Sequence, residues 1–164
     1  MTDLQRLREK LCRELAQSEH SAEVQPRREA RQLGDTPPAA ALLAIADHAE
    51  AMRPRFEAVI ADRRKGQRGV MIGRAIGEMF STLRRAVFDR MIDTERSYRG
   101  TLLGVDHGID VVRMLRAVAI READTPLVEL CEDWLTTRIA LVEHAQLALD
   151  WFAARPELAL QSGR

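Results

Sequence analysis

Residues 93–126 read DTERSYRGTLLGVDHGIDVVRMLRAVAIREADTP, and this stretch decides the fold class. Its large apolar residues recur every three or four positions, which is the spacing of one helix face; they are Tyr98, Leu102, Val105, Ile109, Val112 and Leu115. Asp93 and Thr94 supply a cap before this pattern begins. After it, Asp124 or Thr125 stands before Pro126, which is typical of a new helix start. The stretch therefore predicts a helix over residues 94–121 and the beginning of another.

The same spacing predicts three more long helices. Residues 36–62 begin with two prolines in the first turn, and their stripe is Leu42, Ile45, Ala49, Met52, Phe56 and Val59. Residues 70–92 carry the stripe Ile76, Phe80, Leu83, Val87 and Met91. Residues 126–154 carry the stripe Val128, Cys131, Leu135, Val142, Ala145, Leu149 and Phe152, widened by Trp134 and Trp151. Short links between long helices make neighbours antiparallel, so we expect an all-α, up-down-up-down four-helix bundle over residues 36–155.

The N-terminal segment, residues 1–35, is predicted to be an arm outside this bundle. Residues 3–17 form an amphipathic helix with the stripe Leu4, Leu7, Leu11 and Leu15. Residues 18–35 are polar and interrupted by Pro26, so we expect a connector there. A helix this short needs a covered apolar face. The leucine stripe therefore predicts a homo-oligomer, a protein partner, or packing on the outside of the bundle. Residues 156–164 are expected to form a C-terminal tail.

Composition limits the classes of partner. The chain has 46% hydrophobic and 30% charged residues and no net charge, which is typical of one soluble globular domain. A neutral chain has no overall field that would attract nucleic acid or anionic lipid. Cys12 and Cys131 match no metal or disulfide spacing, and no apolar run is long enough to span a membrane. We expect a cytoplasmic protein that binds neither membrane nor nucleic acid.

Six glycines fall into two runs with a four-residue spacing, which places each run on one helix face. They are Gly69, Gly73, Gly77, Gly100, Gly104 and Gly108. Glycine costs about 1 kcal/mol relative to alanine inside a helix. Close approach of another helix or of a bulky side chain is the usual compensation, so we expect close helix packing at these glycines.

Three histidines are predicted to lie at one height of the bundle when positions are counted from the turns: His48, His107 and His144. Nearby carboxylates include Asp47, Asp110 and Glu143. One interpretation is a transition-metal site, because imidazole and carboxylate are common metal ligands. The other is three polar side chains on the flank of the bundle that bind no ion.

Arg138 interrupts the apolar seam of the last long helix, and counting places it near Glu78 and Arg55. Two interpretations stay open. Arg138 forms a buried ion pair with Glu78, or it joins Arg55 in a clamp for an anion.

The order and length of the helices over residues 36–155 resemble the ferritin-like four-helix-bundle superfamily. This resemblance is one of architecture, because the family's Glu-x-x-His motifs are absent: Ile45, Gly104 and Leu141 stand three residues before the histidines. The resemblance implies a metal-binding protein, an oxidase or an iron-handling protein, with a degenerate site and a transition metal ion as cofactor.

The sequence supports two functions. The first is a non-enzymatic helical bundle without a cofactor, which acts through self-association or a protein partner. No catalytic Ser-containing elbow, phosphate loop or dinucleotide fingerprint is present in the sequence. The alternative is the ferritin-like metal protein.

Overall fold

The computed structural model describes the backbone of residues 2–66 and 93–161 and the side chains of residues 2–59 and 93–161. These residues are all-α. Four helices are long: α1 (Asp3–Leu33), α2 (Pro37–Gly66), α4 (Thr94–Arg121) and α5 (Thr125–Leu147). Two are short, α6 (Leu149–Ala153) and α7 (Pro156–Ala159). The helix predicted at 70–92 and the first glycine run lie outside the described residues.

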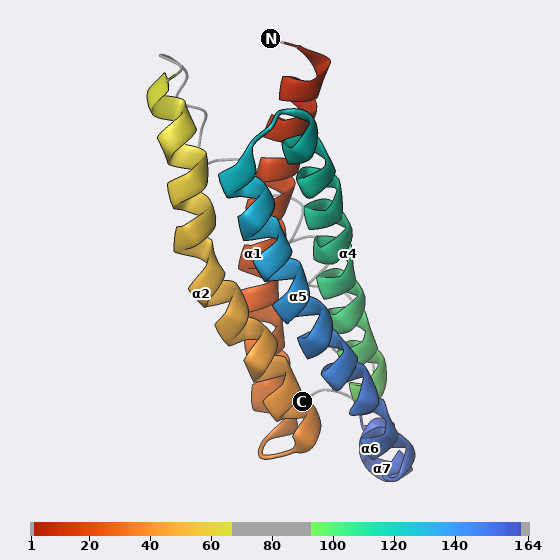
Figure 1. The fold of residues 1–164 in the computed structure, drawn as a ribbon. Coiled ribbons are helices and arrows are strands. Elements are labelled where there is room, and N and C mark those ends of the chain that lie inside the picture. Colours follow the sequence, from red (N-terminus) through yellow and green to blue (C-terminus); the bar gives the residue numbers. More distant parts are fainter. Residues whose placement is uncertain (1, 67–92, 162–164) are drawn as a thin grey trace.

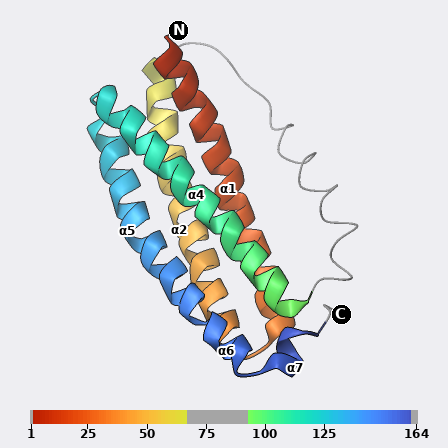
Figure 2. The same cartoon turned by 90° about the vertical axis from the view of Figure 1, so that its right-hand side faces the viewer.

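The four long helices pack in a ring. α1 packs against α2 and α4, and α5 packs against the same two helices. In Figure 1, α1 and α5 run from the upper end to the lower end, whereas α2 and α4 run in the opposite direction. Figure 2 shows the same four helices from the side, with the chain of α6 and α7 gathered at the lower end. Each of the four long described helices is therefore antiparallel to both of its neighbours in the ring.

Helix α1 is the main difference from the sequence prediction. A capping box begins it, because the Thr2 hydroxyl accepts from the Gln5 amide at 3.2 Å and the Gln5 side chain accepts from the Thr2 amide at 2.9 Å. The helix continues through Pro26 to Leu33, and Gly34 ends it with φ +67°. The connector expected at 18–35 is wrong, because burial of Pro26 in the core offsets the hydrogen bond that proline removes.

The leucine stripe of α1 lies inside the ring of helices. Leu11 and Leu15 are fully buried, and Leu4 and Leu7 pack against the core with part of their surface exposed. The stripe was expected to associate with another copy or to lie on the outside of the bundle. It contributes to the core of its own chain instead, so it is not free for association.

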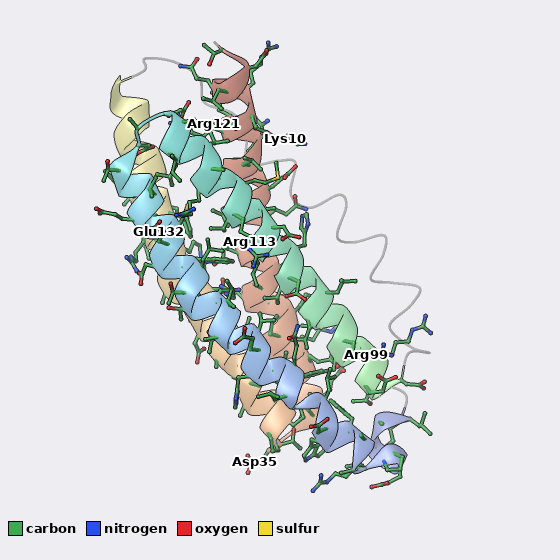
Figure 3. All side chains as sticks on the ribbon, turned by 45° about the vertical axis from the view of Figure 1, so that its right-hand side comes forward. Lys10, Asp35, Arg99, Arg113, Arg121 and Glu132 are labelled. Atoms are coloured by element: carbon green, nitrogen blue, oxygen red, sulfur yellow. The ribbon has the colours of Figure 1, made fainter. Side chains whose placement is uncertain are left out.

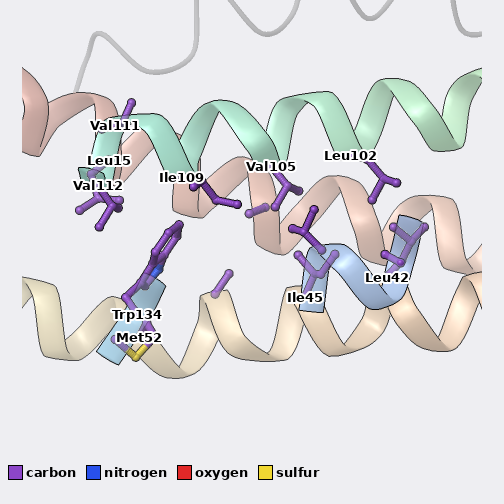
Figure 4. Packing of buried hydrophobic residues seen from close by; sticks show 14 of the residues in the cluster. Leu15, Leu42, Ile45, Met52, Leu102, Val105, Ile109, Val111, Val112 and Trp134 are labelled. Atoms are coloured by element: carbon purple, nitrogen blue, oxygen red, sulfur yellow. The ribbon is translucent and has the colours of Figure 1, made fainter. Parts of the chain in front are cut away.

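The apolar stripes predicted for α2, α4 and α5 are largely confirmed. Every member of the α4 stripe is buried, and so are all members of the α2 stripe except the half-buried Val59. On α5, Cys131, Trp134, Val142 and Ala145 are buried, while Val128 and Leu135 are half-buried. Figure 4 shows part of this core, with Trp134 reaching into it from α5. No described helix is both long and apolar enough to cross a membrane.

The ends of the helices fix how the chain turns. Between α4 and α5, Ala123 adopts a positive φ of 54°, and the Asp124 carboxylate caps α5 by accepting from the Leu127 amide at 3.4 Å. The last long helix was expected to run to about residue 154, but it breaks at Ala148 into α5 and α6. The Thr94 amide donates to the Gln161 carbonyl at 2.9 Å, which ties the end of the chain to the start of α4.

Candidate functional site

Four polar side chains from three helices form a layer in the middle of the core: Glu19 on α1, His48 on α2, and Trp134 and Arg138 on α5. We call this set the polar layer. The Arg138 Nη2 donates to Glu19 Oε2 at 3.1 Å, and the Trp134 indole donates to the same oxygen at 3.0 Å. The Arg138 Nε donates to His48 Nδ1 at 3.0 Å. The guanidinium also lies over the Trp134 ring, 4.7 Å from its centre.

Burial controls the electrostatics of this layer. Glu19 is 4% exposed and Arg138 is 1% exposed. Desolvation raises the pKa of Glu19, although the positive charge of Arg138 lowers it in part. Desolvation also lowers the pKa of Arg138. The pKa of His48 falls to about 4, first because of burial and then because of the Arg138 charge. At neutral pH His48 is therefore an uncharged acceptor.

The polar layer is suited to holding helices together and not to chemistry on a substrate. Its ion pair is sealed from solvent, and the acceptor nitrogen of His48 is already occupied by Arg138. Glu19 Oε1 is buried and has no hydrogen-bond partner among the described residues. A buried pair of this kind often fixes which helices pack together more than it adds to stability.

Arg138 does form a buried ion pair, but its partner differs from the predicted one. The carboxylate comes from Glu19 on α1, and Glu78 lies outside the described residues. Arg55 does not join Arg138 in a clamp. It pairs with Asp133 at the surface, where both side chains are about half exposed. Counting from the turns missed Glu19 because residues 18–35 were not expected to be helical.

The predicted histidine layer does not come together. His48 belongs to the polar layer, whereas His107 and His144 are exposed. Of the carboxylates predicted beside them, Asp47 pairs with Arg27, Asp110 pairs with Arg113, and Glu143 is exposed. Within residues 2–59 and 93–161, no group of three histidine, cysteine or acidic side chains is placed to hold a metal ion.

The three described glycines of α4 differ in their surroundings. Gly108 is buried against α1, and a Cβ added to it would lie 2.6 Å from Ser18 Oγ. Gly108 is therefore in close contact with α1. Gly100 and Gly104 are exposed, and an added Cβ would have nothing within 4 Å. Within the described residues nothing packs on these two glycines, so close packing there stays a prediction. Gly69, Gly73 and Gly77 lie outside them.

An exposed apolar surface lies on the side of α4 that faces away from the core. Leu103 is 72% exposed and Met114 is 51% exposed. With the exposed residues between and beside them they form what we call the outer face of α4: Gly100, Leu103, Gly104, His107, Asp110 and Met114. Figure 3 labels Arg99 and Arg113, two exposed residues of the same helix. The sequence did contain the signal, because Leu103 and Met114 fall outside the buried stripe of the helix.

Comparisons with known proteins give no relative. No family model, no curated protein and no solved structure matches the chain. The helical architecture agrees with the predicted bundle, and no match supports membership of the ferritin-like superfamily.

Proposed function

We propose that this chain is a non-enzymatic helical bundle that acts by association, with itself or with a protein partner, and that the outer face of α4 is the surface it uses. One observation carries the proposal. Leu103 exposes 72% of its surface on a long helix whose other face is fully packed. One exposed leucine is common on a protein surface, and Leu147 is 71% exposed as well, but Leu103 shares its face of α4 with Met114 and with two open glycines. This combination supports a surface that another helix covers.

The open glycines support the same proposal. Gly100 and Gly104 lie one turn apart on the outer face of α4. A Cβ added at either position would have no other atom within 4 Å. Each glycine is unfavourable in a helix by about 1 kcal/mol relative to alanine. Contacts inside the described part of the chain do not compensate this cost. Close approach of an external helix would, because a glycine surface lets two helix backbones come together.

The alternatives have less support. The ion pair of the polar layer is closed to solvent, and its half-buried His48 already accepts from Arg138. The ferritin-like metal protein requires ligands that converge, and the described histidines do not. The cytoplasmic location expected from the sequence fits two cysteines that form no disulfide.

The test is the accessibility of Leu103 in the intact chain at low concentration. Cys12→Ser and Cys131→Ala provide a background without native thiols, and Leu103→Cys is then labelled with a maleimide. We expect a labelling rate comparable to that of Leu147→Cys, because Leu147 is 71% exposed. Leu102→Cys is the matched buried control, since Leu102 is next in sequence and 4% exposed.

Protection of Leu103→Cys to the level of Leu102→Cys would overturn the proposal. In that case another part of the same chain covers the outer face of α4, and no partner is needed.

A further inference from the structure

We infer that His48 is an acid-sensitive latch between α2 and α5: with a bare Nδ1 it holds Arg138 in the core, and with a proton on Nδ1 it releases Arg138 and turns to Asp133 at the surface. The latch is part of the polar layer. It does not use the outer face of α4, so it is separate from the proposed function.

The hydrogen bond from Arg138 fixes the protonation of His48. A guanidinium has donors and no acceptor, so the Arg138 Nε, 3.0 Å from His48 Nδ1, donates to a nitrogen that carries no proton. The neutral ring then carries its proton on Nε2. A second proton can bind only at Nδ1, where it would meet the N–H of Arg138. The hydrogen bond and the second proton therefore exclude each other at this one atom.

The charges around the imidazole differ between its buried and its exposed side. On the buried side, the Arg138 guanidinium is 1% exposed and donates to Glu19 of α1 at 3.1 Å. On the exposed side, Asp133 of α5 pairs with Arg55 of α2, and both side chains are about half exposed. The pKa of His48 falls to about 4 because burial and the Arg138 charge outweigh the attraction of Asp133, and Arg55 lowers it further. An imidazolium is therefore repelled on the core side and attracted by Asp133.

The position of His48 suits a side chain with two partners. His48 is half-buried, and its ring lies 6.1 Å from the ring of Trp134. A change of side-chain rotamer moves such a ring toward solvent without moving the backbone of α2. Arg138 then stays bound to Glu19, so α5 keeps its link to α1 and loses the link that His48 provides to α2. We expect a weaker contact between α2 and α5, with the helices themselves intact.

Long-range ¹H–¹⁵N NMR of the imidazole nitrogens in the intact chain reads the latch directly. At pH 7 we expect His48 to show a bare Nδ1 and a protonated Nε2. On acidification its midpoint should lie near pH 4, against the ordinary 6.5, while far-UV circular dichroism shows that the helices persist. The ring protons of His48 should lose the ring-current shift from Trp134 as the ring turns outward.

Two carboxylates separate a turn toward Asp133 from a general effect of charge. Asp133→Asn should lower the His48 midpoint by about 0.2–0.7 pH units, which corresponds to one partly exposed ion pair. Asp47→Asn is the matched control, because Asp47 is next to His48 in sequence but pairs with Arg27 of α1 at 3.0 Å. It should leave the midpoint unchanged.

The contact between α2 and α5 is read at Trp134. Trp151→Phe leaves Trp134 as the one tryptophan of the chain. Acrylamide quenching of its fluorescence should increase as the pH falls through 4. The increase should be smaller in Trp151→Phe/His48→Gln, because a glutamine amide oxygen accepts from Arg138 at every pH. Since the pKa of Glu19 is raised and Glu19 also takes up a proton in acid, the difference between these two variants is the measure.

Four results would overturn the inference. A His48 midpoint at the ordinary 6.5 would show that Arg138 does not hold Nδ1. A midpoint that coincides with loss of the helical signal would show acid unfolding and no latch. Equal shifts from Asp133→Asn and Asp47→Asn would show that the protonated ring does not turn to Asp133. Equal quenching with and without His48→Gln would show that His48 does not control the contact between α2 and α5.

Discussion

Breaking the polar layer should cost more stability than any surface substitution in this chain. Glu19→Leu removes the acceptor of both Arg138 and the Trp134 indole, which lie 3.1 and 3.0 Å from the same oxygen. A buried charge left without its partner costs about 3–5 kcal/mol. An orphaned buried indole N–H adds about 1–3 kcal/mol, and the two terms overlap. We expect a loss of about 4 kcal/mol in the free energy of unfolding, from a total of about 5–15 kcal/mol for a domain.

The double variant Glu19→Leu/Arg138→Met separates the ion pair from simple packing. It removes both charges together, so the Trp134 indole loses its acceptor and His48 Nδ1 loses its donor, but no buried charge is left unpaired. We expect the double variant to lose at least about 2 kcal/mol less than the sum of the two single variants, because contacting charges are not additive. The assay is urea unfolding followed by far-UV circular dichroism at neutral pH.

Arg116 and Glu132 provide the matched control. They form the same kind of pair at 2.6 Å, but their side chains are 40% and 50% exposed. Glu132→Leu should therefore change stability by less than about 1 kcal/mol. The reasoning is refuted if Glu19→Leu costs no more than Glu132→Leu, or if the two single losses add in the double variant.

Three further predictions concern single positions. Because burial and the Arg138 charge lower the pKa of His48 from 6.5 to about 4, its contribution to stability is complete above pH 6.5 and is lost as the pH falls toward 4. The melting temperatures of the chain and of His48→Gln should therefore differ most above pH 6.5 and approach each other as the pH falls from 6.5 toward 4. A difference in melting temperature that does not change with pH would contradict the pKa shift. Gly108→Ala should stabilise less than Gly104→Ala when measured by urea unfolding, because its Cβ would lie 2.6 Å from Ser18 Oγ and force that hydroxyl to rotate, whereas Gly104→Ala meets no atom and should stabilise by about 1 kcal/mol; the reverse order would show that the faces of α4 are misassigned. Ala123→Gly should raise the melting temperature, since alanine at φ 54° costs about 1–2 kcal/mol, and a lower melting temperature would rule out strain in this turn.

The helical periods of α2 and α4 could be predicted from the sequence because their buried positions hold large apolar residues, such as Ile45 and Leu102. The second half of α1 could not. Its buried positions hold Glu19, Ala22, Pro26 and Glu29, which carry no signal for an apolar face. Glu29 is accommodated because its carboxylate accepts from the Ser97 hydroxyl at 2.6 Å. Partners on another helix make these residues suitable for a core, and the spacing within one helix does not contain that information.

The same limit explains the candidate site. The interruption at Arg138 predicted a buried ion pair, but the side of the bundle that supplies its carboxylate depends on which helix packs there. Periodicity identifies the face that a helix buries and not the segment that covers it. For the same reason the glycine run predicted close packing at Gly108 and Gly104 alike, although only Gly108 faces α1.

Sedimentation velocity of the unmodified chain over a wide range of concentration tests the central claim most directly. The account predicts a mass that rises from 18.5 kDa toward twice that value, and a Leu103→Glu variant that keeps the helical spectrum and stays monomeric throughout. Met114→Ala should shift the rise to higher concentration, because it removes exposed apolar surface from the same face. A mass that stays at 18.5 kDa at every concentration, or a dimer that Leu103→Glu leaves unchanged, would contradict self-association through the outer face of α4.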